Sequence, residues 1–160
     1  MLGLRSVVAI FTALFVAVDV NVAFADPVRP ASGPVILTRA GAEASYTWDS
    51  STYVAQLVNE KVPVAEGLRA LEASALSALA SKAKTAKATT VSIKVVYSRT
   101  GAVSPVYKVA TFAGIEKVCT ITVRRSDLMK DADSWSSSLA AGTVPAQVKI
   151  DVTGRLPEPQ

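Results

Sequence analysis

The chain has 160 residues and a formal net charge of +4, and 50% of its residues are hydrophobic although only 6% are aromatic. It contains one cysteine and no histidine. The single cysteine allows no internal disulfide, and the lack of histidine removes the usual base of serine and cysteine hydrolases and the commonest nitrogen ligand of transition metals. These counts exclude most familiar enzyme templates, and they predict one domain with no metal and no other cofactor.

Residues 1–25 are predicted to be a cleaved secretory signal peptide. Arg5 precedes an apolar run from Val7 to Val18, and Ala23-Phe24-Ala25 forms an A-x-A cleavage site ahead of Asp26. The alternative is a retained membrane anchor, but the run is shorter than the roughly 20 apolar residues that cross a bilayer. We therefore expect a protein that is exported to the periplasm or the extracellular medium, with no transmembrane segment in the mature chain.

The mature chain begins with a proline-rich leader. Residues 26–34 hold three prolines and one glycine, which favours a flexible segment. A single domain is expected over residues 35–156, and a disordered tail over residues 157–160. The first elements of this domain are a short strand at residues 35–37 and a helix from about residue 51, for which Asp49 or Ser50 is the cap. Pro63 limits the helix to about two turns.

Residues 64–86 give the clearest helical pattern in the chain. Leu71 and Leu79 belong to an apolar stripe with steps of three and four residues. Glu66 and Glu72 lie in the N-terminal half and lysines lie at the C-terminal end, which matches the helix dipole. We therefore expect both leucines to pack against a sheet, and the order of the charges needs no ligand to explain it.

The apolar period changes from 3.6 to 2 after this helix. Apolar and polar residues alternate at residues 91–98, and two further strands follow at residues 106–112 and 117–125. A second amphipathic helix has Ser126 as its cap and ends near Gly142, and a last strand covers residues 147–153. The expected fold class is α+β: an antiparallel sheet of about four strands, made of a three-strand meander and a C-terminal strand, backed by one long helix and one or two short helices.

Few residues offer catalytic or metal-binding chemistry. Ser81 and Lys84 have the S-x-x-K spacing of penicillin-binding enzymes, but no S-D-N or K-T-G element accompanies them. The acidic residues Asp127, Asp131 and Asp133 fail the calcium-loop pattern, because no glycine follows at the required position. We therefore predict no catalytic residue and no metal ligand.

Cys119 is the one thiol of the chain. It lies on the strand side that it shares with Ile121 and Val123, which predicts a buried thiol that behaves as a small hydrophobe. An intermolecular disulfide is the alternative, because an odd cysteine in an oxidising compartment often has a partner in another molecule. A strand register that differed by one residue would reverse the preference for burial.

Two groups of residues are candidates for binding. The aromatic side chains of Tyr46, Trp48 and Tyr53 either present a surface for a sugar or an extended peptide, or fill the interior of the domain. The second group consists of cations at outward positions on or beside the sheet, which we expect to attract an acidic partner: Lys94, Lys108, Arg124 and Lys149.

Further basic residues have two interpretations. Arg124 and Arg125 form one positive patch with Lys82, Lys84 and Lys87 if the long helix lies across the sheet. Alternatively, they are solvated strand and helix ends that discourage edge-to-edge aggregation.

The function that these observations favour is an exported, non-catalytic binding or envelope-accessory protein that contacts a protein, a peptide or an anionic envelope polymer. Export and the small, dispersed positive charge argue against nucleic acid as the partner. The alternative is a small exported hydrolase that uses the carboxylates of Glu116 and Asp151 or the pair Ser81 and Lys84.

Overall fold

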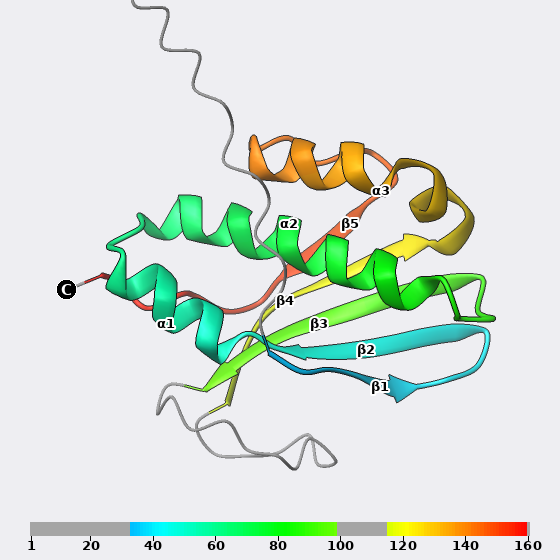
Figure 1. Ribbon diagram of the computed structural model, residues 1–160, viewed down its shortest axis with the longest axis horizontal. Helices are drawn as coiled ribbons and strands as arrows, with labels where there is room; N and C mark the ends of the chain where they lie inside the picture. The colour runs from blue at the N-terminus through cyan, green and yellow to red at the C-terminus, as the bar shows by residue number, and fades with distance from the viewer. Residues whose placement is uncertain (1–32, 99–114, 160) are drawn as a thin grey trace, which may run out of the picture.

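The structure is a computed structural model that describes residues 33–98 and 115–159. These residues form one sheet with helices packed on one side of it (Figure 1). In chain order, the elements are β1 (Val35–Arg39), β2 (Glu43–Asp49), α1 (Ser51–Asn59), α2 (Val64–Ala83), β3 (Thr90–Ser98), β4 (Ile115–Arg124), α3 (Arg125–Ala140) and β5 (Lys149–Val152).

The sheet is mixed, and its five described strands lie in chain order, β1-β2-β3-β4-β5. The pair β2 and β3 is parallel, and the other neighbouring pairs are antiparallel. A parallel pair requires a long crossover, which α1 and α2 supply here. The predicted α+β class is confirmed, but the prediction of an antiparallel sheet of about four strands was wrong in its details.

The main omission of the sequence analysis was β2. In this strand Ala44, Tyr46 and Trp48 are buried, and they alternate with the partly buried Ser45 and Thr47. This is the period of a strand with one buried face. The aromatic residues were interpreted as candidates for ligand binding or core packing, and strand β2, which pairs in parallel with β3, was not predicted.

The predicted three-strand meander also differs from the structure. Strands β3 and β4 pair directly, from Thr90 opposite Arg124 to Ser98 opposite Ile115, so no strand lies between them. The predicted strand at residues 106–112 lies outside the described residues. Strand β4 also begins at Ile115, two residues before the predicted start at residue 117.

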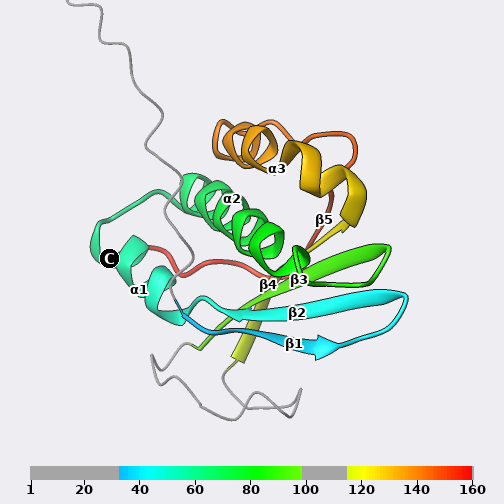
Figure 2. The same ribbon diagram turned by 45° about the vertical axis from the view of Figure 1, so that its right-hand side comes forward.

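Figure 2 shows that the three described helices lie on the same side of the sheet. Leu71 and Leu79 of α2 are fully buried, as predicted from their stripe. The largest fully buried side chains around them come from strands and helices alike: Trp48, Leu76, Ile93, Ile121, Leu128 and Leu139. Burial of such apolar side chains is the main favourable contribution to folding.

The helix boundaries differ by a few residues from the predicted ones. The N-cap of α1 is Ser50, and the Asp49 carboxylate accepts a hydrogen bond of 2.9 Å from the backbone N–H of Ser51. Helix α3 begins at Arg125, one residue before the predicted cap. Helix α2 ends at Ala83, three residues before the predicted end, and a side chain described below binds two carbonyl groups there. Among the described helices, none is both long and apolar enough to cross a membrane.

Candidate functional site

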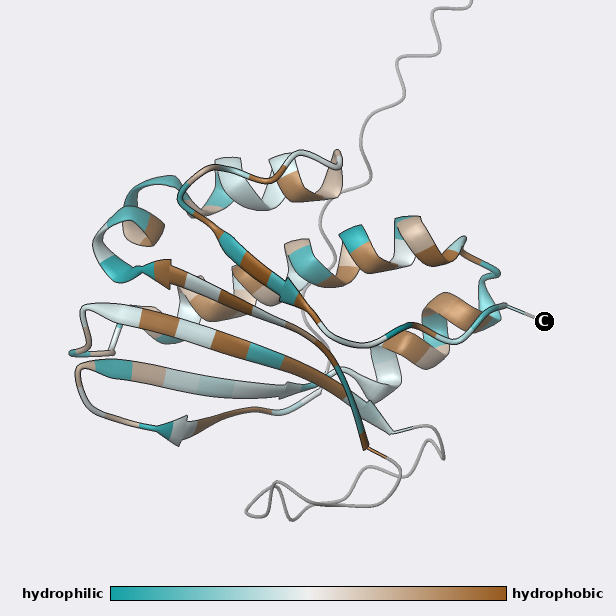
Figure 3. Cartoon of the chain, turned by 180° about the vertical axis from the view of Figure 1, so that it is seen from behind, coloured by the Kyte–Doolittle hydropathy of each residue, from teal (hydrophilic) through white to brown (hydrophobic). Residues whose placement is uncertain are grey.

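The two faces of the sheet differ in chemistry. Along β3, the buried Val91, Ile93 and Val95 face the helices, so Ser92 and Lys94 point to the opposite side. Figure 3 views the sheet from this opposite side, where the strands lie in front of the described helices. We call this side the open face.

Cross-strand register arranges the polar side chains of the open face in three rows. Neighbouring residues within each row come from adjacent strands, and adjacent rows are two residues apart along each strand. The first row is Thr47, Lys94, Thr120 and Asp151; the second is Ser45, Ser92, Thr122 and Lys149; the third is Glu43, Thr90 and Arg124. Exposed Arg39 of β1 lies opposite Ser45 and extends the second row. The open face is therefore a polar surface rich in serine, threonine and cations.

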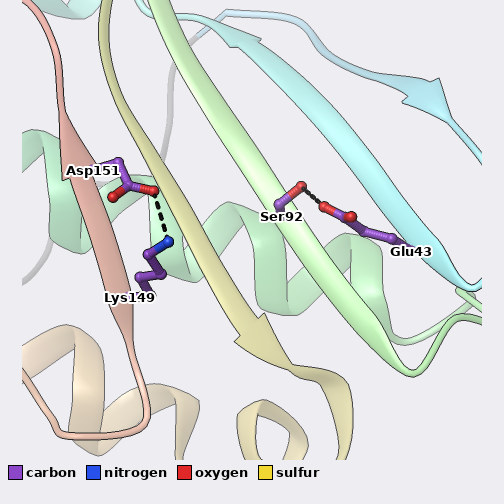
Figure 4. A network of polar contacts seen from close by, with 4 residues as sticks. All are labelled: Glu43, Ser92, Lys149 and Asp151. Atoms are coloured by element: carbon purple, nitrogen blue, oxygen red, sulfur yellow. Dashed lines mark hydrogen bonds and ion pairs between the residues drawn. The ribbon is translucent and has the colours of Figure 1, made fainter.

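The carboxylate of Glu43 is held by hydroxyl groups at one end of the open face. Ser92 Oγ lies 3.1 Å from Glu43 Oε1 (Figure 4). Ser92 Oγ also lies 2.9 Å from Ser45 Oγ, and Ser45 Oγ lies 3.4 Å from the same carboxylate oxygen. Ser92 is buried. These hydroxyl groups solvate the carboxylate within the protein and keep it at the edge of the face.

The cations of the open face are exposed and weakly engaged. Lys149 Nζ lies 3.5 Å from Asp151 Oδ2, and both side chains are more than half exposed (Figure 4). Exposed pairs of this kind contribute only about 0–1 kcal/mol. Within residues 33–98 and 115–159, Lys94 and Arg124 make no ion pair. Three of the four predicted binding cations, Lys94, Arg124 and Lys149, thus lie on one face, and of these Lys149 alone pairs with a described carboxylate. Lys108 lies outside the described residues.

The predicted aromatic site lies in the core instead. Tyr46, Trp48 and Tyr53 are all buried. The rings of Trp48 and Tyr53 pack with centroids 5.9 Å apart and an interplanar angle of 40°, and the Tyr46 hydroxyl is 3.4 Å from the carbonyl oxygen of Lys82. These side chains fill the interior and provide no aromatic surface for a sugar or a peptide.

The two consecutive arginines lie on different sides of the sheet. Arg124 is exposed on the open face. Arg125 turns toward α2, where its Nε donates to the carbonyl oxygen of Ala83 over 2.7 Å and a terminal nitrogen donates to that of Lys84 over 3.2 Å. A cation at this position also interacts favourably with the helix dipole. The single patch predicted for Arg124, Arg125 and the lysines of the helix is therefore divided.

The residues of the alternative catalytic hypotheses do not meet. Ser81 and Lys84 are exposed at the end of α2, and no hydrogen bond joins their side chains in the described structure. Glu116 lies opposite Tyr97 and accepts a hydrogen bond of 2.9 Å from its hydroxyl, whereas Asp151 lies on the open face opposite Thr120. Tyr97 belongs to the buried core on the other side of the sheet. The two carboxylates therefore do not face a common site.

Cys119 and Glu72 form a buried ionisable pair between β4 and α2. Cys119 is fully buried, as predicted, and burial together with the nearby Glu72 carboxylate raises the pKa of the thiol to about 12. A thiol of this kind is inert, and its burial leaves it inaccessible to an intermolecular disulfide in the folded state. Burial also raises the pKa of Glu72, although Arg69 acts in the opposite direction. The charge pattern of the helix had predicted only an interaction of Glu72 with the helix dipole, whereas the side chain is buried.

The open face is the candidate functional site. Lys94, Arg124 and Lys149 of this face were predicted from the sequence, whereas Arg39, Ser45 and Thr47 were not, although the alternating pattern of β2 could have placed Ser45 and Thr47. No group of three histidine, cysteine, aspartate or glutamate side chains in the described part of the chain is arranged to hold a metal ion, and this includes the acidic residues of α3. Comparison of the chain with family models, with curated proteins and with solved structures found no match.

Proposed function

We propose that this chain is an exported, non-catalytic accessory protein of the cell envelope that contacts an acidic partner through the open face. The carrying observation is the position of Lys94 and Arg124, which are exposed on the same polar face and make no ion pair among the described residues. Such cations attract and orient an anionic partner at modest ionic strength.

The chemistry of the open face favours an anionic polymer over a folded protein as this partner. Protein interfaces commonly depend on buried aromatic anchors, but Tyr46, Trp48 and Tyr53 all lie in the core. The face offers hydroxyl groups and cations in regular rows instead. Spaced, exposed positive charges suit a chain of repeating anionic groups.

The test is retention on an immobilised polyanion, with dextran sulfate as the probe, during elution with a salt gradient. We expect the Lys94→Glu, Arg124→Glu double variant to elute at lower salt than the wild type. The matched control is a Lys87→Glu, Lys130→Glu double variant, which changes the net charge equally at exposed positions outside the open face. Equal elution of the two double variants would show that net charge alone governs retention and would overturn the proposed face.

Two further measurements test the other parts of the proposal. The intact mass of secreted or periplasmic protein should correspond to a chain that begins at Asp26, and a mass that still includes residues 1–25 would contradict cleavage. Turnover of an envelope substrate that disappeared in a Glu116→Gln variant would favour the hydrolase hypothesis over non-catalytic binding.

A further inference from the structure

A second surface feature lies away from the open face. A cleft of about 710 Å³ separates α1 and the loop after it from the C-terminal segment, at the end of β3. We call it the tail cleft. Its lining residues are Ser51, Val54, Ala55, Val58, Asn59, Lys61, Tyr97, Ser98, Arg155, Leu156, Pro157 and Glu158. The volume is within the range of about 300–1,000 Å³ that is usual for small-molecule sites.

The C-terminal wall of the tail cleft is anchored to the domain. Leu156 is buried, and its Cδ1 lies so close to Gly67 that a Cβ there would approach it to 3.3 Å. The Tyr97 hydroxyl lies 2.9 Å from the carbonyl oxygen of Arg155. The backbone N–H of Gly154 donates to the carbonyl oxygen of Val118 over 3.0 Å, and a Cβ at residue 154 would clash with the carbonyl oxygen of Lys117. The wall is therefore anchored to the domain through residues 154–156.

The lining combines an apolar surface with unpaired cations. The apolar part of the lining comes from Val54 and Val58 of α1 and from Leu156 and Pro157 of the C-terminal segment. The charged residues of the lining are Lys61, Arg155 and Glu158, and none of them forms an ion pair within the described residues. The cleft thus carries a surplus of positive charge beside an apolar wall.

Lys61 has a backbone conformation that glycine would adopt more easily. Its φ of 55° is in the left-handed region, and it is the one described residue other than glycine with a positive φ. It follows the C-cap of α1 in a Schellman arrangement, in which Val62 N–H donates to the Leu57 carbonyl and Lys61 N–H donates to the Val58 carbonyl, each over 3.0 Å. Glycine is the usual residue at this position, so lysine costs stability there. Such local strain commonly marks a functional position.

From these observations we infer that the tail cleft binds a small amphipathic carboxylate. Its apolar chain packs on Val54, Val58 and Leu156, and its carboxylate is held by Lys61 and Arg155. This inference stands independently of the proposed function, because it uses different residues and a different ligand class.

The central test replaces Lys61 by glycine, which separates stability from binding. The Lys61→Gly variant should have a higher Tm than the wild type, because glycine relieves the strain, and a dissociation constant for decanoate about tenfold higher, because one charge-assisted contact is lost. Isothermal titration calorimetry measures the binding, and decanol is the uncharged reference ligand. The Lys61→Arg variant, which retains the charge, should bind decanoate as the wild type does.

Two variants check that binding occurs in the tail cleft. Ala55→Trp, at an exposed position of the lining, should block decanoate, whereas Lys84→Gln, an exposed lysine outside the lining, should have no effect. Unchanged binding by both Lys61→Gly and Ala55→Trp, or equal affinity for decanoate and decanol, would overturn the inference. Tighter binding of a short peptide with a free C-terminal carboxylate would also overturn it, in favour of a peptide as the occupant.

Discussion

The two faces of this sheet differ in burial along the same strands, and under the proposed function they separate structural stability from partner contact. In β3, Ile93 is fully buried beneath the helices, whereas the next residue, Lys94, is exposed on the open face. The period of two in a strand makes this division possible at single-residue resolution. Substitutions on the covered face should therefore affect folding, and substitutions on the open face should affect contacts while folding changes little.

The largest expected effect comes from the covered face. Leu79→Ala removes a fully buried side chain from α2 and should lower the free energy of unfolding by about 2–5 kcal/mol in urea denaturation. Lys94→Gln, at an exposed position of the open face, should change it by less than about 0.5 kcal/mol. Similar losses in the two variants would contradict the division between the faces.

Arg124 and Arg125 give a second comparison, between an exposed residue of the open face and a residue that binds the end of α2. Arg125→Gln removes the two hydrogen bonds to the end of α2 and should cost about 1.5–3 kcal/mol, the usual value for bonds that involve a charged group. Arg124→Gln should cost less than about 0.5 kcal/mol. Equal effects of the two substitutions on chemical denaturation would show that the cap of α2 is not the role of Arg125.

A smaller, pH-dependent effect is expected at Glu72. Its pKa is raised above the ordinary 4.5 by burial, so the native state holds the proton more tightly than the unfolded state. The stability of the wild type therefore falls as pH rises from about 4.5 through the raised pKa. Glu72→Gln cannot ionise, so it should be the more stable protein at pH 7, and its advantage should shrink as pH falls below 4.5.

The control for this pH dependence is Glu66→Gln, because Glu66 is exposed on the same helix. Thermal unfolding at pH 4 and pH 7 gives the comparison. A Glu72→Gln advantage that was the same at both pH values would exclude ionisation of Glu72 as its cause.

The smallest effect is expected from a substitution of Thr120, a residue of the open face whose hydroxyl group is buried. Among the described residues, Thr120 Oγ1 is a buried side-chain oxygen that has no hydrogen-bond partner. Thr120→Val removes this polar atom with little change of shape, so it should raise the free energy of unfolding by up to about 1 kcal/mol. Thr120→Ser, which retains the hydroxyl, should not be stabilising in the same urea experiment.

Much of the covered face could be predicted from sequence, because apolar periodicity reports burial directly. The stripe of Leu71 and Leu79 and the burial of Cys119 are confirmed. Long-range pairing was not predictable in the same way, since the parallel contact of β2 with β3 depends on residues far apart in the chain. The burial of Glu72 was missed for a related reason, because its local pattern matches the helix dipole and only tertiary packing covers it.

The site was predictable only in part. Outward cations such as Lys94 follow from strand alternation, but the rows that join them across strands require the register. The tail cleft left no clear signal in the sequence. Its parts come from α1, from β3 and from the C-terminal segment, which are far apart in the chain.

The order of the strands has a consequence for how the chain folds. Strands β1 and β2 are joined by residues 40–42, so their hairpin closes a very short loop. The parallel pairing of β2 with β3 must instead close the segment from residue 50 to residue 89, and the entropic cost of closure rises with loop length. During synthesis from the N-terminus, the hairpin has no further strand to pair with until residues 90–98 have emerged. We therefore expect formation of the helical crossover to limit the folding rate, and a chain truncated before residue 90 to expose the edge of β2.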